Sequence, residues 1–157
     1  MQIYDNKYYL CRGYKLNKTN KQLIFFHIPK TAGTTICNIL HNLFKSSFRI
    51  KGSPTNARGN FSAYEFFYSN KKNILNSNFD FVYGHFQYCI SSYFPNRISI
   101  TTLRNPVERC ISHYNWIMEK NLIDKDISLE ECFKKNLITP NIITQIFSGA
   151  NNKDLNI

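Results

Sequence analysis

Acidic residues are scarce in this sequence, and their scarcity sets its charge. Among 157 residues there are 10 Asp and Glu against 20 Lys and Arg, which gives a formal net charge of +10 at pH 7. Such an excess suits a polyanionic partner: nucleic acid, an anionic polysaccharide, a phosphorylated cofactor or an acidic membrane face. A basic surface that is merely solvated has the same composition, so charge alone does not choose among these partners.

Long apolar runs are missing too. No window reaches the roughly 18 apolar residues that a membrane span needs. Residues 1–20 are polar and tyrosine-rich, without the apolar core of a signal peptide. We therefore expect a soluble, cytoplasmic protein as the sequence stands, or one whose anchor lies outside this stretch. Residues 1–21 are interpreted as an irregular lead-in.

The cysteines lack the spacings of a metal site or of a disulfide framework. Their number, five, is odd, no two stand as Cys-x-x-Cys, and no pair of histidines accompanies them. Cys37 and Cys110 fall beside apolar residues on predicted helices, where a free thiol packs as a small hydrophobic group. We expect reduced thiols and no bound metal.

The apolar content is enough for the core of one domain, at 43% hydrophobic and 15% aromatic residues. The spacing of apolar residues predicts strands over residues 22–27, 46–51, 79–83 and 97–103. It predicts helices over residues 34–44, 61–68, 106–118, 129–136 and 141–147. Strands that alternate with helices indicate a single α/β domain over residues 1–157, with a mainly parallel central sheet flanked by helices.

The segment from His27 to Thr35, His-Ile-Pro-Lys-Thr-Ala-Gly-Thr-Thr, joins the first predicted strand to the first predicted helix. Backbone N–H groups and the dipole at a helix start attract an anion, and Lys30 adds a full charge. The usual nucleoside-triphosphatase loop places its lysine after the second glycine, whereas Lys30 precedes the only glycine of this loop by three residues. Alternatively the segment is a plain turn, in which Gly33 relieves crowding and a threonine caps the helix.

Two further predicted strands end in residues that can carry chemistry. His85 follows Gly84 after the third strand, and Arg104 follows the fourth. In parallel sheets ligands bind at the carboxyl ends of the strands. We therefore expect Lys30, His85 and Arg104 to lie along one edge of the sheet.

Capping signals mark the starts of two later helices. Asn105 is a suitable N-cap, Pro106 suits the first helical position, and Glu108 can reach back as in a capping box. Ser128 with Glu131 gives a second capping box.

Two long segments resemble a known family. Residues 26–35 resemble the 5′-phosphosulfate loop of the Golgi-type carbohydrate sulfotransferases, the group that includes the heparan sulfate 2-O- and 6-O-sulfotransferases. Residues 102–114, Thr-Leu-Arg-Asn-Pro-Val-Glu-Arg-Cys-Ile-Ser-His-Tyr, look like that family's 3′-phosphate segment. Residues 83–86 are similar to its Gly-His element, and residues 141–149 weakly resemble a later segment. Order and spacing match from about residue 23 to residue 149.

The resemblance implies a three-layer, P-loop-like fold and 3′-phosphoadenosine 5′-phosphosulfate (PAPS) as sulfuryl donor. Carried over residue by residue, Lys30 would neutralise the leaving oxygen, and Arg104 and Ser112 would bind the 3′-phosphate. The 5′-phosphosulfate would be held by the whole loop: Lys30, Thr31, Ala32, Gly33, Thr34 and Thr35. The implied reaction is in-line transfer to a hydroxyl of a carbohydrate acceptor, which needs positioning and charge stabilisation rather than a metal.

His85 is our candidate for the catalytic base, because histidine titrates near neutral pH. The alternative is that His85 only orients or caps a neighbouring group. Glu65 and Glu108 are weaker rivals for the same role. We expect His113 at the surface or in a cap, and Arg109 facing either solvent or the cofactor.

Two features depart from the family pattern. Family members usually have Arg-Asp-Pro where this chain has Arg-Asn-Pro at residues 104–106, a mild change because asparagine also caps helices. Family domains are also longer, with a C-terminal part that helps to close over the adenosine and, in the Golgi, a membrane anchor. A compact relative, a fragment and a degenerate copy are all compatible with this chain, and a place in the Golgi lumen would require an anchor outside it.

Two other functions stay open. A P-loop kinase or nucleoside-triphosphatase would need a Walker lysine and a strand-end aspartate for magnesium, and the sequence shows neither. A non-catalytic polyanion-binding domain would need only the charge. No nucleic-acid module is recognisable, so we expect a glycan partner rather than nucleic acid. The oligomeric state is open.

The acceptor is expected to meet a rim formed by residues 52–60 and 87–96. Tyr88, Tyr93 and Phe94 lie in the second of these stretches. They either stack on a sugar or serve as packing aromatics, and the sequence does not decide between the two.

Overall fold

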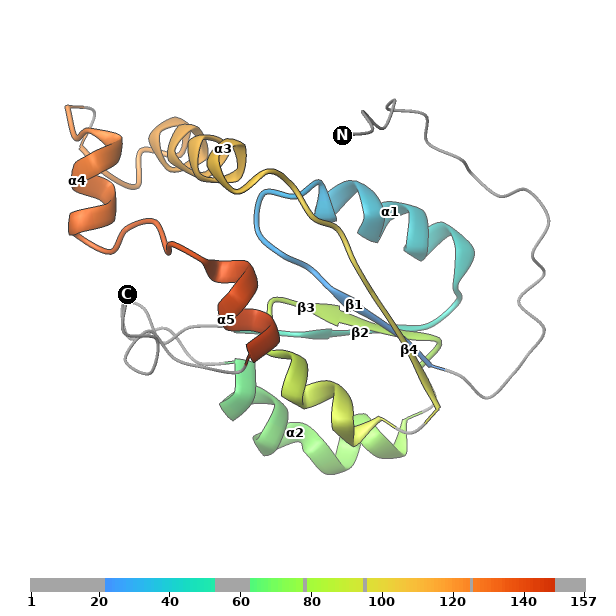
Figure 1. Cartoon of the computed structure of the whole chain (residues 1–157). Coiled ribbons are helices and arrows are strands. Elements are labelled where there is room, and N and C mark those ends of the chain that lie inside the picture. The colour runs from blue at the N-terminus through green and yellow to red at the C-terminus, as the bar shows by residue number, and fades with distance from the viewer. Residues whose placement is uncertain (1–21, 53–62, 78, 95, 125, 149–157) are drawn as a thin grey trace, which may run out of the picture.

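The computed structural model describes residues 22–52, 63–77, 79–94, 96–124 and 126–148 (Figure 1). The expected lead-in over residues 1–21 lies outside the described residues, as does most of the expected rim loop over residues 52–60.

Four strands form the central sheet in the order β2-β3-β1-β4, and every neighbouring pair is parallel. The strands are β1 (Gln22–Phe26), β2 (Ser47–Ile50), β3 (Phe81–Gly84) and β4 (Arg97–Thr101). Phe26, the last residue of β1, pairs with Gly84 on one side and with Thr101 on the other. The carboxyl ends of these three strands therefore meet at one edge, as the sequence predicts.

Helices cover both faces of the sheet, which confirms the three-layer α/β prediction (Figure 1). Successive strand residues point to opposite faces. Phe25 packs against α1 (Gly33–Leu43) through Cys37 and Leu40. Ile24 and Phe26 belong to the larger cluster on the other face, which includes residues of α2 (Ala63–Asn76), the 3₁₀ helix η2 (Tyr88–Tyr93) and α5 (Ile142–Ser148).

The remaining helices, α3 (Pro106–Glu119) and α4 (Leu129–Lys134), lie to one side of the sheet (Figure 1). They share a separate apolar cluster around Ile117, Cys132 and Ile138. The capping box of Ser128 and Glu131 is present at the start of α4 and confirms that prediction.

Several element boundaries differ from the prediction by a few residues, and two of the differences have a clear cause. The helix expected over residues 61–68 continues to Asn76, because Phe67 and Ile74 are one heptad apart and both are buried. The strand expected to reach residue 103 ends at Thr101, whose hydroxyl donates to the carbonyl of Phe26 at 2.8 Å. Since β1 ends at Phe26, β4 loses its ladder partner there, and Arg104 lies in the connection rather than at the strand end.

The four described cysteines, Cys37, Cys89, Cys110 and Cys132, are free thiols. Within the part of the chain that the structure describes, no helix is both long and apolar enough to cross a membrane.

Candidate active site

The turn after β1 presents the start of α1 without a side-chain cap. Ala32 is the N-cap residue in a left-handed conformation with φ of 64°, and no side chain bonds to the first-turn N–H groups. The first helical bond runs from the N–H of Ile36 to the carbonyl of Ala32, at 3.2 Å. Because the N–H groups of Gly33, Thr34 and Thr35 lack helical acceptors, they can bind an anion at this point.

Thr31 differs from the other threonines of the turn. It is only 4% exposed, and its hydroxyl donates to the carbonyl of Ile28 at 2.9 Å. The same oxygen lies 2.9 Å from the hydroxyl of Thr102. Thr31 thus ties the turn to the connection after β4, whereas Thr34 and Thr35 are exposed. We had expected its hydroxyl to face an anion, and it is used inside the protein instead.

Asn105 begins α3 as predicted, with its side chain accepting from the N–H groups of Val107 at 3.0 Å and Glu108 at 3.3 Å. Pro106 occupies the first turn, also as predicted. The predicted capping box is wrong: the Glu108 carboxylate accepts from Nε of Arg104 at 3.4 Å. The spacing of four residues brings the guanidinium over this carboxylate, which attracts a cation more strongly than a neutral N–H.

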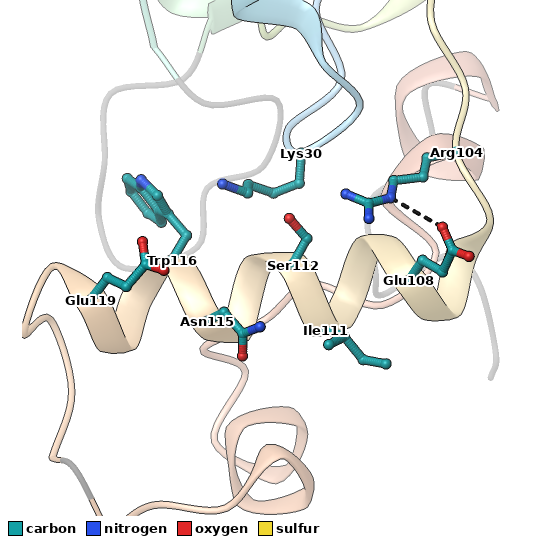
Figure 2. Close-up of a pocket in the computed structure, with 8 residues that line it drawn as sticks. All are labelled: Lys30, Arg104, Glu108, Ile111, Ser112, Asn115, Trp116 and Glu119. Atoms are coloured by element: carbon teal, nitrogen blue, oxygen red, sulfur yellow. Dashed lines mark hydrogen bonds and ion pairs between the residues drawn. The ribbon is translucent and has the colours of Figure 1, made fainter. Parts of the chain in front are cut away.

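A cavity of about 340 Å³ lies between the turn after β1 and the flank of α3. Figure 2 shows Lys30 on one side of it and Ser112 on the facing surface of α3, with Arg104 near the helix start. Eight residues line it: Lys30, Arg104, Glu108, Ile111, Ser112, Asn115, Trp116 and Glu119. Three predicted site residues therefore share one cavity, while His85 and residues 31–35 are not part of its lining.

Trp116 is one of the lining residues that sequence reasoning missed, with Ile111, Asn115 and Glu119. Nζ of Lys30 lies 5.5 Å from the centre of its indole ring, and Trp116 is 38% exposed (Figure 2). Such a contact attracts a cation to the ring face. The helical spacing could have identified Trp116, because a residue four positions after Ser112 lies on the same helix face.

His113 is not the surface or capping residue that we expected. Its ring is half-buried and lies against Trp116, with ring centres 6.0 Å apart. Burial, together with the charges of Arg109 and Lys30, lowers the pKa of His113 to about 4. His113 is therefore a neutral packing residue of α3 at neutral pH.

Arg109 does not face solvent, so that alternative is wrong, and it is not among the residues that line the cavity. Its side chain is buried, with 2% exposure, and donates to the carbonyl of Thr139 at 3.0 Å and to Sγ of Cys110 at 3.1 Å. It therefore ties α3 to the segment before α5.

His85 follows β3, and its ring lies against that of His27, with ring centres 4.4 Å apart and an interplanar angle of 39°. Its Nδ1 is hydrogen-bonded to the backbone carbonyl of His27. Since a carbonyl only accepts, Nδ1 carries the proton, and Nε2 of the neutral ring is then an acceptor. Burial lowers the pKa of His85 below its ordinary value. Glu65, the rival base, is exposed on α2.

The aromatic residues proposed for the rim have different environments. Phe94 is fully buried and packs against Phe67. Tyr93 contacts Phe67 and is covered by Lys71, whose Nζ lies 4.0 Å from its ring centre. Tyr88 packs against Phe26 and Phe147 and is 40% exposed.

Comparison with known proteins gave one match. The model of the sulfotransferase family matches residues 13–154. Neither a search of curated proteins nor a search of solved structures returned a match. Because the match covers far more than half of the sequence, the chain belongs to the sulfotransferase family, which includes the Golgi carbohydrate sulfotransferases.

Proposed function

We propose that this protein transfers a sulfuryl group from PAPS to a hydroxyl of a carbohydrate. Membership of the sulfotransferase family implies PAPS as the donor. The proposal depends on one observation: Lys30 of the first motif shares a cavity with Arg104 and Ser112 of the second. These residues lie far apart in sequence, yet they line one cavity, and the carboxylates of Glu108 and Glu119 line it with them.

The residues of the cavity suit a donor that is anionic at two points. Lys30 and Arg104 are the two cations of the cavity lining, and the uncapped start of α1, which follows Lys30 in the chain, has N–H groups without helical acceptors. The ion pair with Glu108 uses only Nε of Arg104, so the other guanidinium N–H groups can reach a phosphate. A volume of about 340 Å³ falls in the range of roughly 300–1,000 Å³ common for small-molecule sites.

The sheet order suggests where the acceptor enters. His85 follows β3 and Arg104 follows β4, and these strands flank β1 on opposite sides. A donor held between the turn after β1 and α3 leaves the β3 side free for the acceptor. The incoming hydroxyl would then approach from the side opposite to the adenosine, as in-line transfer requires.

Each side chain has one role in this reaction. PAPS supplies the sulfuryl group, whose bond to the phosphate oxygen breaks as a bond to the acceptor oxygen forms. Lys30 stabilises the charge that develops on the leaving oxygen, and Arg104 and Ser112 hold the 3′-phosphate. Nε2 of His85 accepts the proton of the acceptor hydroxyl. The carbohydrate acceptor itself is inferred from the family, which includes carbohydrate sulfotransferases, and from the net charge of +10.

Donor binding is tested by titration calorimetry with adenosine 3′,5′-bisphosphate. We expect Arg104→Ala to weaken binding about 10- to 100-fold, since a hydrogen bond to a charged group contributes about 1.5–3 kcal/mol. Lys134→Ala is the matched control, because it removes one exposed cation of a similar ion pair on α4. Glu108→Gln should bind at least as tightly as the unchanged protein, because it releases Arg104. No binding by the unchanged protein, or an equal loss in Lys134→Ala, would refute the assignment.

Transfer is tested with labelled PAPS and a panel of glycans. We expect Lys30→Ala and His85→Gln to lower kcat by about 100-fold or more, the scale of a lost electrostatic or base contribution. His85→Gln should still bind adenosine 3′,5′-bisphosphate, which separates catalysis from binding.

Magnesium-dependent ATP turnover would favour a kinase instead. Glycan binding that survives Lys30→Ala and Arg104→Ala without any sulfate transfer would favour a non-catalytic binding domain.

A further inference from the structure

The ring of His27 is partly buried and contacts three neighbours. It stacks on Phe25 with ring centres 5.8 Å apart and an interplanar angle of 16°. On the β3 side it lies against the ring of His85. Above it is Gly33, where an added Cβ would overlap Cδ2 and Nε2 of the His27 ring. The His27 ring therefore fills the space that a side chain at position 33 would occupy.

The His27–His85 pair lies in a cationic rather than an acidic environment. Arg49 of β2 is the charged group that acts on both rings, and it disfavours a proton on either. The α1 residue over the pair is Gly33, which carries no charge. Burial, His85 and Arg49 lower the pKa of His27 to about 4, so His27 is neutral across roughly pH 5 to 8.

We propose that His27 is a positioning residue for the transfer step: its ring, packed against the His85 imidazole, holds that imidazole with Nδ1 on the His27 carbonyl and Nε2 toward the acceptor. This inference rests on the proposed function, in which His85 is the base. Backbone and side chain of one residue then act together, since the carbonyl selects the tautomer and the ring fixes the orientation.

The arrangement of the two rings also determines the pH range in which His85 can accept a proton. In the step, the acceptor O–H bond breaks, an Nε2–H bond forms on His85, and the proton later passes to solvent water. The His27 ring excludes water from one face of His85, which disfavours the charged imidazolium. His85 therefore stays an unprotonated acceptor at a lower pH than an exposed histidine.

The direct test is an NMR titration of the His85 ring in the full chain, with the signal assigned by its loss in His85→Gln. We expect His85 in the unchanged protein to titrate below 6.5. His27→Ala should raise its pKa toward 6.5, because the opened space admits water, while His27→Phe keeps a ring in place and should leave it low. Identical titrations in all three proteins would overturn the proposal.

The kinetic test follows the acidic limb of the kcat/KM profile. His27→Ala should move this limb to higher pH and lower kcat by about 10- to 100-fold, the scale of a misplaced reacting group, and His27→Phe should restore most of both. A merely structural role would lower activity at every pH without moving the limb, and that result would also overturn the proposal.

The two proposals can fail separately. If His85 titrates as expected but no glycan is sulfated, the proposed function fails while the arrangement of the two rings holds. If sulfate is transferred and neither the titration nor the pH profile responds to His27, only the positioning role fails.

Discussion

Gly33 is the residue at which local and tertiary preferences conflict most clearly. It is a residue of the first turn of α1, where alanine would by itself favour the helix by up to about 1 kcal/mol. The His27 ring, however, occupies the position of an alanine Cβ. The glycine is therefore required by the His27 ring, which follows β1, and not by the backbone of the helix.

We expect Gly33→Ala to lower the free energy of unfolding by about 1–3 kcal/mol, the usual cost of forcing extra atoms into a packed site. Urea denaturation measures this change. The double variant His27→Ala/Gly33→Ala should recover much of the loss, because the two substitutions act on the same space. A Gly33→Ala protein more stable than the unchanged one would show that helix propensity outweighs the overlap.

Charged residues show how far single positions can be interpreted from sequence. Lys30 and Arg104 stand in motifs, so their meeting at one cavity could be predicted. The burial of Arg109 could not, because it depends on the carbonyl of Thr139, which only the return of the chain toward α5 brings near. The neutral state of His113 likewise depends on packing around α3.

Among the elements, α3 supplies most of the residues that line the cavity. Ser112 and Trp116 lie one turn apart on the face toward Lys30, while Ile117 faces the cluster shared with α4. The point where the helix begins decides which residues share these faces. Asn105 sets that point, because its side chain satisfies two N–H groups of the first turn.

We expect Asn105→Ala to cost about 1 kcal/mol of stability, the typical value of an N-cap, and to weaken adenosine 3′,5′-bisphosphate binding. Urea denaturation and calorimetry on the same protein check both effects. Ser128→Ala is the matched control, since it removes the cap of α4, which does not line the cavity. The Ser128→Ala protein should lose a similar amount of stability and keep its affinity for adenosine 3′,5′-bisphosphate. Equal loss of affinity in both variants would mean that α3 has no special part in binding.

For the whole molecule, buried neutral histidines couple folding to pH. The folded pKa of both His27 and His113 is about 4, against 6.5 for an ordinary histidine. Between these values the unfolded chain binds more protons, so the free energy of unfolding rises with pH. The stability that these neutral histidines contribute is fully present above about pH 6.5 and is lost as the pH falls toward 4.

We therefore expect the free energy of unfolding to fall by roughly 1–2 kcal/mol per histidine over this window, less than the full linkage value because both rings keep partial solvent contact. Urea denaturation at a series of pH values measures it. His113→Phe, which keeps a ring that cannot titrate, should flatten the dependence. An unchanged slope in that variant would assign the acid sensitivity to other groups.

The sequence by itself determined the alternation of strands and helices, the lysine-bearing turn at the start of a helix and the capped start of α3. These features depend on periodicity and on residues within a few positions of one another, which local chemistry decides. Tertiary structure alone decided that β4 ends at Thr101, that the His27 ring lies against that of His85, that Arg109 is buried and that Nζ of Lys30 lies over the Trp116 ring. Each of these depends on packing between segments distant in the chain, and neither spacing nor composition records which groups will exclude water from one another.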